Sequence, residues 1–195
     1  MAADLLLDPS LGSREVVVGK RATSLLTYSK DNINKQSLDK KLEEVQKKPH
    51  IINIHEDEML DRKQAYDLTE DGKIMVGRKN ANPEAQIVLG GIGVQKNHAF
   101  FEVDGDGNAV LNPFNSSCKD DIKINGQKIA GPTILNHGDR VVFGTSNAFL
   151  YRDPEKNPED LKEDVDFDFI ANEINDVNEQ ERSALIEAKN EEEEK

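Results

Sequence analysis

The segment AFFEVDGDGNAVL, residues 99–111, contains the pattern that decides the fold. Two short runs rich in aromatic and β-branched residues, 99–103 and 109–111, flank five residues of turn type, 104–108. Aromatic and β-branched side chains favour strands, whereas Asp, Asn and Gly favour turns. The segment therefore predicts two strands joined by a turn.

The same pattern extends outward on both sides of this segment. Further strand-type runs are 51–54, 73–76, 86–89, 122–124, 140–143 and 148–151, with turn signals such as Asn125-Gly126 and His137-Gly138 between them. Many short strands separated by turn residues are typical of an all-β sandwich or barrel. We expect one all-β domain over residues 49–153.

The flanking segments have a different character. Residues 1–36 show no lasting period of 2 or 3.6 and are expected to form an extended N-terminal arm. Residues 37–48 predict a short helix with Ser37 as its N-cap, because Leu38, Leu42 and Val45 share one helical face. A linker is expected over 154–165, an acidic C-terminal helix capped by Asp166 over 166–190, and an acidic end over 191–195.

The charge of the chain is strongly negative and unevenly placed. The 195 residues have a formal net charge of −13, and residues 160–195 alone hold 14 acidic and 4 basic side chains. Such a chain lacks the basic excess that a broad nucleic-acid surface needs, so no nucleic-acid partner is expected. No apolar run is long enough to predict a membrane span. A single cysteine, Cys118, and an N-terminus without a basic signal region favour a cytoplasmic protein.

The sequence offers little support for catalysis, metal binding or a cofactor. Residues 104–108 resemble the start of a calcium loop, but Ala109 and Asn115 stand where an EF-hand needs Gly and Glu. The four histidines lie in separate segments without the spacing of metal ligands. No phosphate-binding loop of the Walker type is present. We therefore expect no enzyme, no metal and no cofactor.

One combination of residues does suggest a family. Gly77-Arg78 ends one strand-type run, His98 begins another 20 residues after Arg78, and Asn125-Gly126 lies at a later turn. This arrangement resembles the forkhead-associated (FHA) domain, a β-sandwich whose loops at one end bind phosphothreonine peptides. The fold expected from it is an FHA-type β-sandwich with flanking short α-helices and an extended N-terminal arm.

The resemblance narrows to the FHA region in the tail of kinesin-3 class kinesins. It rests on the order and spacing of seven stretches and covers about residues 38–180; the stretches are 49–57, 76–78, 87–91, 96–98, 124–129, 132–144 and 165–174. The chain shows no nucleotide-binding element. The resemblance therefore implies a tail-like module without the motor domain.

The resemblance also suggests residues for phosphopeptide binding. Arg78 takes the place of the arginine that contacts the phosphate, whereas Gln95 replaces a phosphate-binding serine and Asp120 replaces a peptide-binding asparagine. Lys96 and Lys119 can partly compensate as point charges. The alternative role of Arg78 is to tie two loops together. Gly77, His98, Asn125 and Gly126 are expected to be structural residues of the motif.

Three functions follow from these features. The first is a non-catalytic cytoskeletal scaffold, associated with microtubules or a cilium, that binds tubulin, axonemal or kinesin proteins through the FHA domain, arm and helices. The second is a phosphothreonine-peptide-binding module that recruits a phosphorylated partner. The third is a regulator that pairs with a full-length kinesin.

Overall fold

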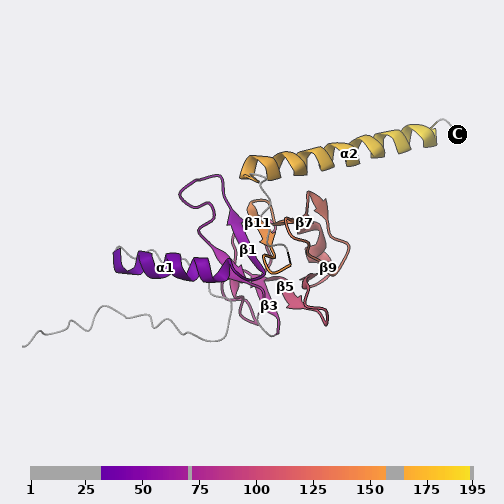
Figure 1. The fold of residues 1–195 in the computed structure, drawn as a ribbon. Helices are drawn as coiled ribbons and strands as arrows, with labels where there is room; N and C mark the ends of the chain where they lie inside the picture. The colour runs from indigo at the N-terminus through magenta and orange to yellow at the C-terminus, as the bar shows by residue number, and fades with distance from the viewer. Residues whose placement is uncertain (1–31, 70–71, 157–164, 194–195) are drawn as a thin grey trace, which may run out of the picture.

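The computed structural model describes residues 32–69, 72–156 and 165–193 (Figure 1). Of the arm expected over residues 1–36, residues 1–31 lie outside the described residues. Residues 157–164 of the expected linker and the last two residues of the acidic end lie outside them as well.

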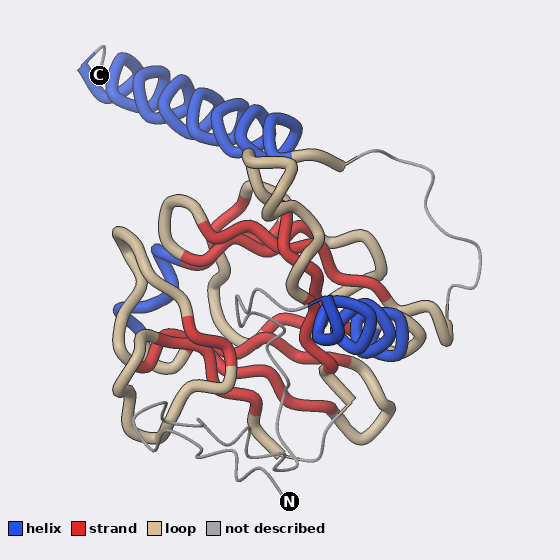
Figure 2. Tube along the Cα trace, turned by 90° about the vertical axis from the view of Figure 1, so that its left-hand side faces the viewer, coloured by secondary structure: helices blue, strands red, loops and turns tan. Residues whose placement is uncertain are grey.

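Two mostly antiparallel β-sheets face each other and form the centre of the molecule (Figures 1 and 2). The six-stranded sheet has the order β2-β1-β11-β10-β7-β8, and the five-stranded sheet has the order β4-β3-β5-β6-β9. Among the strands of the described residues, only β3 and β4 pair in parallel. The first sheet comprises β1 (His50–Ile54), β2 (Ala65–Asp67), β7 (Ile122–Ile124), β8 (Gln127–Lys128), β10 (Arg140–Phe143) and β11 (Asn147–Arg152). The second comprises β3 (Ile74–Gly77), β4 (Ile87–Val88), β5 (Asn97–Val103), β6 (Ala109–Pro113) and β9 (Thr133–Ile134).

The expected β-sandwich is thus confirmed, and each strand-type run of the sequence forms a strand. Three strands were not predicted, namely β2, β8 and β9. β2 contains Asp67, β8 is polar and exposed, and β9 is two residues long and follows Pro132, so none of them shows the apolar pattern of a strand.

The core between the sheets is built around aromatic side chains. Phe143 contacts Phe101 and Phe149 edge to face, with ring centroids 6.2 and 5.9 Å apart, and Phe149 contacts Tyr66 in the same way. All four side chains are almost fully buried. Edge-to-face aromatic contacts add to the free energy of burial itself, so this cluster ties both sheets together.

One end of each of two helices packs on the outer face of the six-stranded sheet. Leu42 and Val45 from α1 (Asn32–Val45), together with Ile170 and Ile174 from α2 (Phe167–Glu193), pack on a second apolar cluster that includes Ile52, Ile54, Val142 and Leu150. Beyond Val177, α2 extends away from the sandwich, and its residues 178–190 are exposed (Figure 1).

The helix boundaries differ from those expected. α1 begins at Asn32, so Ser37 lies inside the helix and is not its cap, and it ends at Val45 instead of 48. Two contacts accompany the early end: Lys48 forms an ion pair with Asp67 at 2.8 Å, and the Lys48 carbonyl lies 2.6 Å from the His50 ring. These contacts lie where residues 46–48 turn towards β1. Asp166 caps α2 as expected, its carboxylate accepting the Phe169 N–H at 2.7 Å.

Candidate functional site

Gly77 lets two strands approach unusually closely where β3 ends. A Cβ atom at this position would lie 1.9 Å from the Lys96 carbonyl oxygen. The register between β3 and β5 shifts at the same place, between Val76 and Gly77. The following amide, that of Arg78, donates to the Lys96 carbonyl at 3.0 Å. Glycine is therefore required here for a steric reason, and it brings Arg78 next to residues 95–96.

The Arg78 side chain is exposed but held in place by the loop between β4 and β5. Its Nε donates to the Val94 carbonyl at 2.6 Å and its Nη2 donates to the Gly91 carbonyl at 2.9 Å. Within the described part of the chain, its Nη1 makes no hydrogen bond. The guanidinium thus ties two loops together, as the alternative role proposed, and still presents an oriented pair of N–H donors.

Gln95 connects the same loop to a short 3₁₀ helix, η1 (Ser116–Asp121). Its Nε2 donates to the carbonyl and the hydroxyl oxygen of Ser117, both at 3.2 Å. Lys119 belongs to this helix. The structure therefore connects the segments that contain Arg78, Gln95, Lys96 and Lys119 at one end of the sandwich, although these residues come from three separate loops. Within the described part of the chain, the side chains of Lys96 and Lys119 make no hydrogen bond or ion pair.

Asp120 follows Lys119 in η1 and is strongly exposed. The side chain is 80% accessible, and its nearest cation is the Lys128 ammonium group at 4.0 Å. A negative charge therefore lies on the loop that borders the cationic residues.

His98 has a structural place beneath these loops. The ring is fully buried, and it contacts Phe143 edge to face. Its Nδ1 accepts the Gln95 N–H at 3.3 Å and its Nε2 lies 3.4 Å from the Asp121 carbonyl oxygen, which fits a neutral ring protonated on Nε2. Burial lowers the pKa of His98, which favours this neutral form. His98 links the loop before β5 to the end of η1.

Asn125 and Gly126 lie at the other end of β7 from η1 and form the two-residue turn to β8. Both have positive φ, 52° and 78°, as this kind of hairpin turn requires. Asn125 donates to the Asp139 carboxylate at 2.8 Å and accepts the Arg140 N–H at 2.9 Å. A Cβ on Gly126 would lie 2.9 Å from the Glu173 carbonyl oxygen, so α2 rests on this turn. Gly126 thus lies against the helix, and Asn125 ties the turn to Asp139 and Arg140, at the other end of β7 from the cationic loops.

Sequence reasoning missed Asn115 and Ser117. The Asn115 carboxamide oxygen accepts the Ser117 N–H at 2.9 Å and the Ser117 hydroxyl at 2.6 Å, which caps η1. The segment Asn-Ser-Ser is a typical start of a helical turn, so this signal was present in the sequence.

The described residues show no cluster of three or more His, Cys, Asp or Glu side chains that could hold a metal ion. Among the same residues, no helix combines the length and the apolar character that crossing a membrane requires.

Comparisons with known proteins show which proteins the chain is similar to. The family model of the FHA domain matches residues 74–144. The chain is 35% identical over 114 residues to the kinesin-like protein KIF1A of Rattus norvegicus and 35% identical over 111 residues to the kinesin-like protein unc-104 of Caenorhabditis elegans. Each match covers 56% of this chain but only 6% and 7% of the relative. A solved FHA domain, that of the CT664 protein from Chlamydia trachomatis, is 20% identical with a TM-score of 0.44, covering 54% of this chain and 97% of that one.

The chain therefore contains an FHA domain, which is a protein–protein interaction module. Its FHA region is similar to that of kinesin-3 family members, whose length it spans only in small part.

Proposed function

We propose that this chain is a non-catalytic interaction module that binds phosphothreonine in a partner protein through Arg78, Lys96 and Lys119. The observation that supports this proposal most is the orientation of the Arg78 guanidinium group. Two backbone carbonyls orient its guanidinium, and its Nη1 amino group has no partner in the described part of the chain. An oriented guanidinium suits the planar, two-point contact to a phosphate group.

The surrounding charges favour the same ligand. A phosphothreonine side chain has a charge of about −1.5 to −2 at neutral pH. Lys96 is exposed beside Arg78, since its carbonyl accepts the Arg78 N–H. Lys119 lies on the helix that Gln95 anchors. The Gln95 amide group, which donates to Ser117, adds a neutral polar group between the segments that contain these cations.

The test is a pull-down with the tagged full chain from its own cell lysate, divided into phosphatase-treated and untreated halves. Partners captured only from the untreated half support the proposal. Lys96→Glu should abolish their capture without disturbing the loops, because the Lys96 side chain makes no hydrogen bond in the described residues. Arg182→Ala, on the exposed part of α2, is the matched control. Partners unaffected by phosphatase and by Lys96→Glu would contradict phosphate-dependent binding.

A cytoskeletal setting belongs to the proposal as well. It is supported by the similarity to kinesin-like proteins and by α2, which extends from the sandwich with Leu185 and Ile186 exposed. In this setting the module brings a phosphorylated partner to a microtubule-based assembly. Deleting residues 1–31, which precede α1, should release the chain from that assembly and leave the sandwich folded. Retained cosedimentation with microtubules by the shortened chain would contradict a role for the arm.

A further inference from the structure

Asp120 occupies a position from which it can select among phosphorylated peptides. In a 3₁₀ helix, side chains three residues apart lie one above the other, so Asp120 stacks on the same face of η1 as Ser117. The Gln95 side chain donates a hydrogen bond to the Ser117 hydroxyl oxygen, and the Gln95 backbone carbonyl accepts the Arg78 N–H at 3.3 Å. The Asp120 carboxylate therefore borders the proposed phosphate site.

The carboxylate is available for a ligand. Its contact with Lys128 is 4.0 Å long, and the two side chains are 80% and 48% exposed. Exposed ion pairs of this kind contribute little free energy, because water screens both charges and two long side chains must be ordered. A cation from a bound peptide can replace Lys128 at small cost.

The charge balance indicates which peptide fits. Three cations, Arg78, Lys96 and Lys119, are enough to neutralise one phosphate dianion. The remaining carboxylate would repel a second anion and attract a cation beside the phosphate. The net charge of −13 works in the same direction, since it disfavours the approach of acidic segments.

We infer that Asp120 is a specificity-determining residue that favours phosphothreonine peptides with Lys or Arg near the phosphorylated residue and rejects acidic ones. This inference rests on the proposed function, because it names the ligand class of the same site.

The experiment uses the full chain and three degenerate phosphothreonine peptide libraries, whose flanking positions are rich in Lys and Arg, in Ala and Ser, or in Asp and Glu. Each library has an unphosphorylated counterpart, and binding is followed by fluorescence anisotropy. Because an exposed ion pair contributes about 0.2–1 kcal/mol, the basic library should bind about 1.4- to 5-fold more tightly than the neutral one. Asp120→Asn should remove most of this preference.

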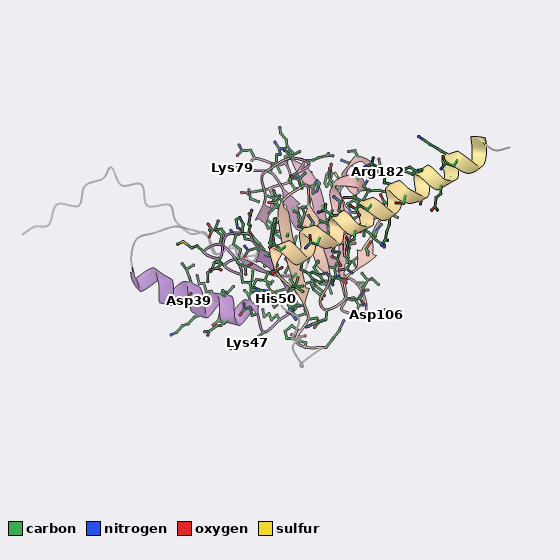
Figure 3. All side chains as sticks on the ribbon, turned by 90° about the horizontal axis from the view of Figure 1, so that it is seen from above. Asp39, Lys47, His50, Lys79, Asp106 and Arg182 are labelled. Carbon is green, nitrogen blue, oxygen red and sulfur yellow. The ribbon has the colours of Figure 1, made fainter. Side chains whose placement is uncertain are left out.

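A matched control separates Asp120 from the general charge of the chain. Asp106→Asn changes the net charge by the same amount, and Asp106 is exposed in the turn between β5 and β6. Figure 3 shows it on the opposite side of the sandwich from Lys79, the neighbour of Arg78. The Asp106→Asn variant should keep the preference for basic peptides.

The outcomes are distinct. A preference for the basic library that Asp120→Asn removes and Asp106→Asn retains supports the inference. Phosphate-dependent binding without such a preference, or with one that both variants alter equally, overturns the inference and leaves the proposed function standing. Equal binding of phosphorylated and unphosphorylated libraries overturns both.

Discussion

Replacing Gly77 with Ala tests whether the close approach of β3 and β5 builds the site. The new Cβ would lie 1.9 Å from the Lys96 carbonyl oxygen, whereas real Cβ contacts are essentially never shorter than 3.0 Å. The two backbones must therefore separate by about 1.1 Å, the difference between these two distances. This movement loosens the Arg78 N–H bond to Lys96 and the Leu89 N–H bond to Gly77, which are 3.0 and 2.8 Å long.

The expected cost follows from these losses. Overpacking costs about 1–3 kcal/mol and each backbone hydrogen bond about 0.5–1.5 kcal/mol, so we expect Gly77→Ala to lower the free energy of unfolding by roughly 3 kcal/mol. For a domain of this size, the melting temperature should fall by about 10 °C. Denaturant unfolding followed by circular dichroism measures the change.

A second glycine provides the control. Gly90 is exposed in the loop between β4 and β5, and a Cβ there would have no atom within 4 Å. Gly90→Ala should stay within about 0.5 kcal/mol of the original chain, as surface substitutions do. If Gly77→Ala unfolds at the same denaturant concentration as Gly90→Ala, the steric reasoning about this site is wrong.

Three further predictions concern the sandwich and its helix. Burial lowers the pKa of both His50 and His98 from the ordinary value of 6.5, so these side chains bind protons more tightly in the unfolded chain. The free energy of unfolding should therefore be constant above pH 7 and fall as the pH drops below about 6.5. Denaturant titrations at pH 7.5 and 5.5 that coincide would contradict this. Ile170→Ala should weaken the packing of α2 by about 2–4 kcal/mol and speed amide exchange over residues 167–177, whereas Ile186→Ala, at an exposed position, should not. Gly126→Ala should destabilise the chain by about 1–2 kcal/mol from its positive φ alone, with a further loss where α2 rests on the turn; a melting curve unchanged from the original would refute this.

The sequence predicted the sandwich well because its core strands show their burial directly. β5 and β6 alternate or cluster apolar residues and are separated by an Asp-Gly turn, and both form as expected. The edge strands β8 and β9 were missed because two-residue edge strands bury almost nothing and show no apolar pattern. The end of α1 was missed as well, and it is accompanied by the contact of Lys48 with Asp67, 19 residues away.

The candidate site was predictable only in part. The FHA resemblance suggested Arg78 and His98, and the structure shows which loops each side chain contacts. The bond from Gln95 to Ser117 joins residues 22 positions apart, and no local pattern indicates it. The position of Asn125 and Gly126 under α2 likewise depends on how a helix some 45 residues later packs, which spacing in the sequence does not reveal.

The most direct test of the central claim is the binding of the purified full chain to an immobilised phosphothreonine peptide library and to its unphosphorylated form. We expect binding only to the phosphorylated library, weakened about 10-fold or more by Arg78→Ala, because hydrogen bonds to charged groups contribute about 1.5–3 kcal/mol. Lys96→Glu should weaken it as well. Equal binding to both libraries, or phosphate-dependent binding that neither variant weakens, would show that Arg78 and Lys96 do not form a phosphothreonine site.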